Sequence, residues 1–449
     1  MPLTDLLRRL RRGLSRPPEP PQRGPDFIDV RELAARLDEA TLMRSADAYF
    51  AGIGLKSEQC RKPWGNPADA VHQTRHLGLV LEAADLFRGA RVLDFGCATG
   101  WLTLGLSQMG CDAIGVDIAP SALRLAEQLK AARPPAQGAG TLSFAAYDGH
   151  RLPVDDASLD RIICFDAFHH VRDQAATLRE FARVLKPGGR AAFIEPGPEH
   201  SKTPQSQAEM ARFAVIENDV DMAVVSRHAI DAGFEPPRML VQFQQPFTLE
   251  ASEVLDWSER GVPMGWGWRA MRTLGRQLTI GQCFFIVRRG TSSEMPDSRR
   301  PEGLGAKLVL EQAARLPSGR GHAIRLRVRA SNVGSSVWRS AAGSGQVNLG
   351  VQLTDAEGHL RDANFARLRM PSTAGAGVVP GESVVFEGTL PVPDLPACVL
   401  RVDLVSELVA WFSQRGAVEP LLLGESDIVQ EIVDEAPGRP RSAPQSSGR

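Results

Sequence analysis

Three side chains in the middle of the chain have the chemistry that proton transfer requires. His169 and His170 follow an apolar segment, residues 159–165, and Glu195 ends a second apolar segment, residues 190–195. Imidazole titrates near neutral pH, so either histidine is suited to act as a general base toward a hydroxyl group. Adjacent residues rarely face the same pocket, so we expect at most one histidine to act directly. A structural role for each histidine, and a base, hydroxyl-binding or solvated role for Glu195, remain open.

The same residue types also bind metals, but their spacing argues against a metal site. His169, His170, Glu195 and His200 show no characteristic ligand spacing. The six cysteines form no C-x-x-C pair and no zinc spacing; they occupy positions 60, 97, 111, 164, 283 and 398. We therefore expect no metal, and we interpret the cysteines as reduced thiols in a cytoplasmic protein.

A second chemical signal lies in residues 91–100, where an apolar segment leads into a glycine-bearing turn and then into a helix-forming stretch. This turn places an acid and small residues at alternate positions: Asp94, Gly96, Ala98 and Gly100. A dinucleotide-binding loop has the different spacing G-x-G-x-x-G, which disfavours an NAD-dependent oxidoreductase. Asp117 ends the next apolar segment about twenty residues later, a position from which an acid can bind the hydroxyls of a ribose.

The 91–100 stretch resembles motif I of the class I S-adenosylmethionine-dependent methyltransferases, with Ala98 in place of the commonest glycine. The resemblance continues through Asp148 and Gly149, similar to the loop at the adenine edge, and through residues 184–189. It implies S-adenosylmethionine as the cofactor, with the glycine loop against its methionine part. The binding residues that it implies are Asp94, Gly96, Ala98, Gly100, Asp117, Ile118, Asp148, Gly149 and Asp166. The alternative is that these glycines and acids are ordinary turn residues of another α/β protein.

Alternating strands and helices must bring these residues together. The pattern predicts strands at 113–117, 142–147, 159–165 and 190–195, and a helix at 120–132. In an open parallel sheet, ligands bind beyond the carboxyl ends of the strands. The predicted fold is a Rossmann-like, doubly wound α/β core. Its ligand-binding edge is expected to carry Gly96, Asp117, Asp148, Asp166 and Glu195.

Helices are expected before and after this core. Asp29 and Asn66 are suited to begin two leading helices, which in related methyltransferases often cover the cofactor. Candidate pocket residues, with plain packing as the alternative, are Tyr49, Phe50, Lys62 and Trp64. Later elements are expected as helices at 207–216 and 226–233 and as a final antiparallel pair of strands at 238–243 and 282–288. An insertion between these strands, suited to a lid or a small satellite core, carries Trp257, Met264, Trp266, Trp268 and Met271.

The hydrophobic pattern changes to an alternation of period two after a polar stretch at 291–302. Strands are predicted at 323–329, 346–353, 383–387 and 399–404. We therefore expect an all-β sandwich at 303–425. Residues 332–338 and 403–412 resemble accessory β-domains of bacterial surface-polysaccharide biosynthesis enzymes, with core packing of Trp338 and Trp411 as the alternative.

Composition and the chain ends limit the expected partners. The 449 residues carry a formal net charge of -1, which does not favour nucleic acid. Residues 1–25 combine a short basic helix with a proline-rich run, interpreted as a solvated tail or as a weak contact with an anionic membrane surface. The chain lacks the roughly eighteen consecutive apolar residues of a membrane span, so we expect no stable membrane insertion. The expected divisions are a disordered basic segment at 1–25, the methyltransferase-like domain with its leading helices at 26–290, a linker at 291–302, the β-sandwich at 303–425 and a disordered tail at 426–449.

Together these features predict a cytoplasmic S-adenosylmethionine-dependent methyltransferase that O-methylates a saccharide or glycan in surface-polysaccharide biosynthesis. One alternative is methyl transfer to a small molecule or a lipid. Another is a non-catalytic protein that binds a glycan or a partner through a degenerate methyltransferase core. The sequence identifies neither the acceptor atom nor the oligomeric state.

Overall fold

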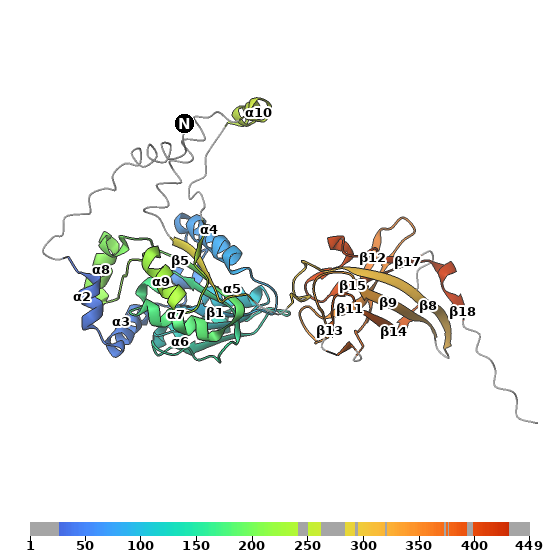
Figure 1. Cartoon of the computed structure of the whole chain (residues 1–449), viewed down its shortest axis with the longest axis horizontal. Helices are drawn as coiled ribbons and strands as arrows, with labels where there is room; N and C mark the ends of the chain where they lie inside the picture. The colour runs from blue at the N-terminus through green and yellow to red at the C-terminus, as the bar shows by residue number, and fades with distance from the viewer. Residues whose placement is uncertain are drawn as a thin grey trace, which may run out of the picture. The chain divides into compact units, whose positions relative to one another are not determined.

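The computed structural model of the chain describes residues 27–240, 250–261, 283–291, 295–318, 321–371, 374–375, 377–392 and 398–430. The chain divides into two compact units, Met1–Ser293 and Glu294–Arg449 (Figure 1). Each unit has its own apolar core. No helix in the described part combines the length and the apolar character that crossing a bilayer requires.

The first unit is built on a seven-stranded sheet with the order β3-β2-β1-β4-β5-β7-β6. The strands are β1 (Arg91–Phe95), β2 (Asp112–Asp117), β3 (Leu142–Ala146), β4 (Leu159–Phe165), β5 (Leu185–Glu195), β6 (Arg238–Met239) and β7 (Cys283–Arg288). Strands β1 to β5 are parallel, whereas β7 runs antiparallel to both β5 and β6. The expected Rossmann-like α/β core and its final antiparallel pair of strands are both confirmed.

Helices cover both faces of this sheet because the strands are apolar on both faces. Leu93 and Ile162 pack on one face with helices α7 (Gln174–Val184) and α9 (Met222–Asp231). Val92 and Ile163, one residue away along the same strands, pack on the other face with α4 (Pro67–Ala84) and α5 (Trp101–Gln108). The remaining helices are α2 (Val30–Arg36), α3 (Glu39–Ala51), α6 (Pro120–Ala132), α8 (Pro204–Phe213) and α10 (Ala251–Arg260), with the short 3-10 helices η1 (Glu58–Arg61), η2 (Phe168–His170) and η3 (His200–Lys202).

Local capping explains where several helices begin. Asn66 accepts a hydrogen bond from the backbone of Asp69, and Pro67 fills the first position of α4, as expected. Two predicted helices begin earlier than their apolar pattern indicated. Helix α8 starts at Pro204 because Thr203 caps it, and α9 starts at Met222 because Asp221 caps it.

The second unit places two main sheets around one apolar core, the arrangement of a β-sandwich. One sheet has the order β14-β9-β8-β18, and in the other β12, β11 and β15 pair in that order, with β16 and β17 on β15. The strands are β8 (Ala306–Ser318), β9 (Gly321–Asn332), β11 (Val347–Thr354), β12 (Leu360–Leu368), β14 (Ser383–Pro391), β15 (Val399–Ser406), β16 (Ala410–Trp411), β17 (Leu421–Leu423) and β18 (Val429–Gln430), with a separate pair, β10 (Trp338–Arg339) and β13 (Gly377–Val378). Trp338 is fully buried and meets Phe412 edge to face, so it is a core residue.

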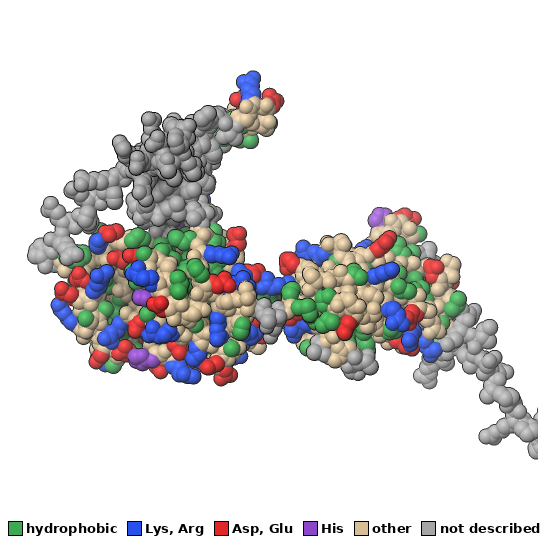
Figure 2. Space-filling model, viewed as in Figure 1, with side chains coloured by type: hydrophobic (Ala, Val, Ile, Leu, Met, Phe, Trp, Pro, Cys, Tyr) green, Lys and Arg blue, Asp and Glu red, His purple; other side chains and the backbone are tan. Residues whose placement is uncertain are grey.

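The sandwich extends beyond its expected limits on both sides. Ser298, placed in the expected linker, is buried and donates a hydrogen bond to the carbonyl of Gly345. Strand β18, placed in the expected tail, pairs with β8. Residues 1–25 and 431–449, and the insertion residues Met264, Trp266, Trp268 and Met271, lie outside the described ranges, whereas Trp257 belongs to α10. On the face drawn in Figure 2, acidic and basic side chains are interspersed on both units.

Candidate functional site

A cavity of about 1250 Å³ opens at the carboxyl ends of β1, β2 and β4. Its walls come from these strand ends and from the leading helices α2 and α3. Val30 of α2 packs with Met210 and Ile216, which attaches this helix to α8 and to the segment that follows α8. Ligand sites of about 300–1,000 Å³ accommodate one drug-sized molecule, so this cavity has room for two ligands.

The glycine loop after β1 forms one end of the cavity. Gly96, Ala98 and Gly100 all adopt positive φ angles, +70°, +48° and +76°. A Cβ atom on Gly96 would lie 2.6 Å from the Cβ of Ala167, so this glycine permits the close packing of two loops. Ala98 adopts the left-handed conformation although it is not a glycine, and its N–H donates a hydrogen bond of 2.9 Å to Asp117 Oδ2.

Two buried acids lie beneath this loop. Asp117 accepts a second hydrogen bond of 2.9 Å, from the N–H of Ala119 to its Oδ1, and each carboxylate oxygen keeps a lone pair for a ligand. Asp94 is only 2% exposed and accepts a hydrogen bond of 2.6 Å from the Thr103 hydroxyl. Burial, with a smaller contribution from the Asp117 charge, raises the pKa of Asp94 to about 7.

The predicted adenine-edge residues also line the cavity. Asp148 accepts hydrogen bonds from the backbone N–H groups of His150 and Arg151, and these bonds lower its pKa. Ile118 and Gly149 complete this side of the wall. Eight of the nine predicted cofactor-binding residues therefore line one cavity, and the ninth, Gly100, is the N-cap residue of α5 at the end of the loop.

Lys62 and Asp166 face the cavity from different elements. Burial, followed by the charge of Glu195, raises the pKa of Asp166 to about 6, whereas the nearby Lys62 charge opposes this shift. Burial lowers the pKa of Lys62. Tyr49 and Phe50 of α3 also line the cavity. Trp64, the fourth candidate pocket residue, does not line it, since its side chain is 69% exposed on the surface.

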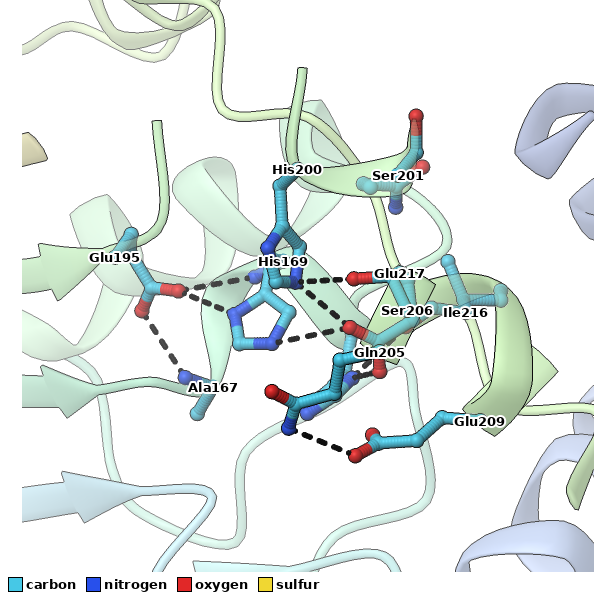
Figure 3. Close-up of polar contacts among 12 residues, drawn as sticks. Ala167, His169, Glu195, His200, Ser201, Gln205, Ser206, Glu209, Ile216 and Glu217 are labelled. Carbon is cyan, nitrogen blue, oxygen red and sulfur yellow. Dashed lines mark hydrogen bonds and ion pairs between the residues drawn. The ribbon is translucent and has the colours of Figure 1, made fainter. Parts of the chain in front are cut away.

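The three candidate proton-transfer residues occupy two different layers. His170 lines the cavity, whereas His169 and Glu195 are buried behind the wall and do not line it. Glu195 Oε2 lies 2.8 Å from His169 Nδ1, and the carboxylate also accepts backbone hydrogen bonds from Ala167 and Phe168 (Figure 3). Of the roles left open for these residues, the geometry favours a structural one for His169 and Glu195, because their contacts fix the turn that positions His170.

A further buried group, Glu217, was not found from the sequence. It lies between α8 and α9 outside any helix, strand or recognised motif, and its side chain is 3% exposed. Its Oε2 lies 2.7 Å from His200 Nε2 (Figure 3). His200 thus joins the cluster through Glu217, a contact that depends on long-range packing.

The lining of the cavity is strongly acidic. Among the described residues it includes the carboxylates Asp29, Glu39, Asp94, Asp117, Asp148, Asp166, Asp173, Glu199, Glu209, Asp219 and Asp221, but as Lys or Arg only Arg31, Lys62, Arg172 and Lys202. Carboxylates accept hydrogen bonds from hydroxyl groups and repel anions. The lining as a whole therefore suits a neutral polyhydroxyl ligand better than a phosphorylated one.

Comparison with known proteins connects this geometry to a family. Residues 93–193 match the sequence profile described as "Methyltransferase domain". An uncharacterized methyltransferase of Mycobacterium tuberculosis is 40% identical over 104 residues, which cover 23% of this chain and 39% of that protein. The ubiquinone biosynthesis O-methyltransferase of Bordetella pertussis is 25% identical over 187 residues, 40% of this chain and 70% of that protein.

The segment that matches the methyltransferase profile lies within the first unit. The first curated relatives are matched over about four tenths of their own length. The matched segment contains most of β1, all of β2 to β4 and most of β5, and thus the loop and acids at one end of the cavity. The first unit therefore carries an S-adenosylmethionine-dependent methyltransferase domain.

Proposed function

We propose that the chain transfers a methyl group from S-adenosylmethionine to a hydroxyl group of a neutral saccharide or glycan. The observation that carries this proposal is one cavity, which is lined by eight of the nine predicted cofactor-binding residues and by further carboxylates suited to hydroxyl groups. The similarity to an O-methyltransferase over 70% of that protein's length supports oxygen as the acceptor atom.

The residues at the cofactor end fit S-adenosylmethionine. Asp117 has lone pairs available for two ribose hydroxyls. The hydrogen bonds that it accepts from the backbone N–H groups of Ala98 and Ala119 hold its carboxylate at the strand end. Asp148 and Gly149, which the family resemblance assigns to the adenine edge, line the same cavity. When bound, the cofactor supplies a methyl group on a sulfonium, which is open to in-line displacement.

The chain's own residues then have to orient the acceptor and exclude water. In well-aligned reactions these effects lower the activation free energy by several kcal/mol. Helices α2 and α3 are placed to do this, since residues of both line the cavity. Arg172 and Glu39 form an ion pair of 3.0 Å that connects α3 to the turn beyond His170. We assign His170 to contact with the acceptor hydroxyl, because it is the member of the predicted trio that lines the cavity.

The second unit is assigned to recognition of the glycan chain. Support comes from the resemblance of residues 332–338 and 403–412 to accessory β-domains of polysaccharide enzymes. The half-buried Trp411 also carries the guanidinium of Arg367 over its ring, with the Arg367 Cζ 4.4 Å from the ring centroid. Such amphipathic aromatic surfaces are common in binding sites.

The test is release of S-adenosylhomocysteine with a panel of neutral oligosaccharides, nucleotide sugars, lipids and small phenols. The proposal expects turnover with neutral saccharides, little with the anionic nucleotide sugars, and weaker saccharide turnover by residues 1–290 alone. Turnover with phenols or lipids only, unchanged by truncation, would instead assign the chain to the small-molecule class. A protein that does not bind S-adenosylmethionine in calorimetry would be the non-catalytic alternative.

A further inference from the structure

We propose that His169, His170 and Glu217 form a binding site for a divalent transition-metal ion in the wall of the cavity, with zinc-type ligand chemistry. The inference is independent of the methyl-transfer proposal, because it rests on the side-chain cluster alone. It departs from the expectation of no metal, since adjacent histidines and an acid 47 positions after His170 form no recognisable motif in the sequence.

The donor atoms of the three residues converge on one point. One donor atom from each of His169, His170 and Glu217 lies within 4.8 Å of the other two. His169 Nε2 lies 3.9 Å from Glu217 Oε2, and His170 Nδ1 lies 3.3 Å from Glu217 Oε1. His170 Nδ1 also lies 2.8 Å from the carbonyl oxygen of Ile216, so metal binding through this nitrogen would replace that hydrogen bond. Donor atoms bound at 2.0–2.1 Å around a tetrahedral ion lie about 3.3 Å apart, so small side-chain shifts suffice to surround an ion.

His169 is oriented in the manner of a metal ligand. Its Nδ1 lies 2.8 Å from the ionisable Glu195, whose carboxylate is fully buried and accepts backbone N–H groups. Donation of the Nδ1 proton to this carboxylate leaves a lone pair on Nε2, which faces Glu217 (Figure 3). Metal-binding histidines almost always donate their second ring N–H to a carboxylate or a carbonyl in this way.

Glu217 supplies the second, independent observation. The residue is 2% exposed, and its Oε1 is buried without a hydrogen-bond partner in the structure. Its other oxygen, Oε2, is held by His200 at 2.7 Å and lies 3.9 Å from His169 Nε2, so the carboxylate is fixed with Oε1 toward His170 and Oε2 toward His169. A buried acceptor without a donor is costly, and a cation bound between Glu217 and the histidines removes this cost.

The ligand set indicates the class of ion and the direction from which it is reached. Two imidazoles and one carboxylate favour Zn²⁺ or another ion of its kind over Mg²⁺ or Ca²⁺, which prefer oxygen ligands. The His170 side chain is 46% exposed and lines the cavity, whereas the other two ligands are buried. A bound ion would therefore present its open coordination positions to the cavity, where it would supply Lewis acidity.

Metal uptake by the full-length protein tests the site without cofactor or acceptor. Metal-free protein is dialysed against Zn²⁺ or Co²⁺, and the bound ion is measured by elemental analysis and by the visible absorption of Co²⁺. We expect one ion per chain and binding weakened by about 100-fold in Glu217→Gln and in His170→Ala. Because His170 is half exposed, its variant should keep the wild-type thermal unfolding profile.

The matched control is His359→Ala, which removes the histidine of an exposed cluster with Asp355 and Glu357 in the second unit. This variant should bind the ion as the wild type does. Absence of stoichiometric uptake by the wild type, unchanged affinity in both site variants, or loss of the ion in His359→Ala would each overturn the proposal. None of these results depends on methyl transfer, so the two proposals fail separately.

Discussion

Asp94 shows how burial of one carboxyl group makes stability depend on pH. The folded protein raises the pKa of Asp94 from its ordinary value near 4 to about 7, chiefly through burial. The folded chain therefore binds this proton more tightly than the unfolded chain does, so the free energy of unfolding falls as the pH rises from about 4 through 7.

The variant Asp94→Asn should remove this loss. The amide oxygen still accepts the hydrogen bond from Thr103, but the side chain carries no charge. On going from pH 5 to pH 8, we expect the free energy of unfolding of the variant to rise relative to that of the wild type by more than about 1.4 kcal/mol, the equivalent of one pKa unit. Urea unfolding at the two pH values measures this difference. An equal effect at both would show that Asp94 does not titrate in this range.

Asp117 is expected to carry a large share of cofactor affinity. In Asp117→Ala, the ribose acceptor is lost and the N–H groups of Ala98 and Ala119 lose their partner. We expect binding of S-adenosylmethionine to weaken at least tenfold, about 1.4 kcal/mol, as measured by calorimetry. Asp112→Asn, at the opposite end of the same strand, is the control and should bind normally. Near-normal binding by Asp117→Ala would contradict the assigned site.

Gly96 is constrained by protein packing rather than by the cofactor alone. The family resemblance places this loop against the methionine part of the cofactor, but the atom that an added Cβ at Gly96 would meet in the structure is the Cβ of Ala167. Gly96→Ala should therefore lower the free energy of unfolding by at least 1–2 kcal/mol, roughly the cost of its left-handed conformation, and also impair cofactor binding. Gly105→Ala in α5, where an added Cβ meets no atom within 4 Å, should not destabilise the protein. Equal urea midpoints for the two variants would refute this account.

At the level of elements, α3 caps the helix that follows β2. The N-cap residue of α6, Ala119, offers no side-chain hydrogen bond, and Asp47 of α3 instead accepts the N–H of Ser121 at 2.6 Å. Asp47→Ala should destabilise the first unit by about 1 kcal/mol, the typical value of a helix cap, whereas Asp47→Asn keeps an acceptor and should cost less. Thermal or urea unfolding compares the two. Equal losses would show that the cap is not the stabilising feature.

The sequence predicts those parts of the site that follow from strand periodicity. Gly96, Asp117, Asp148 and Asp166 end or follow strands of one parallel sheet, so their convergence follows from the fold class. Glu217 could not be predicted, because it reaches His169 only through the path of an irregular segment. Adjacency in the sequence also could not show which of the two histidines lines the cavity.

At the scale of the whole molecule, two separate cores account for the change in sequence pattern. In the first unit, strands buried on both faces give continuous apolar runs such as Leu159–Phe165. In the second, strand β14 (Ser383–Pro391) alternates between buried and more exposed residues over its first four positions. The change of period therefore placed the second fold correctly, but polar residues such as Ser298 gave no sign that the sandwich begins before residue 303.

The most direct test of the central claim is transfer of an isotopically labelled methyl group from S-adenosylmethionine by the full-length protein. The account predicts label on a hydroxyl oxygen of a neutral saccharide, with one S-adenosylhomocysteine formed per methyl group transferred. It also predicts loss of this transfer in Asp117→Ala and its retention in Asp112→Asn. Cofactor binding without transfer to any saccharide, or equal transfer by the two variants, would contradict it.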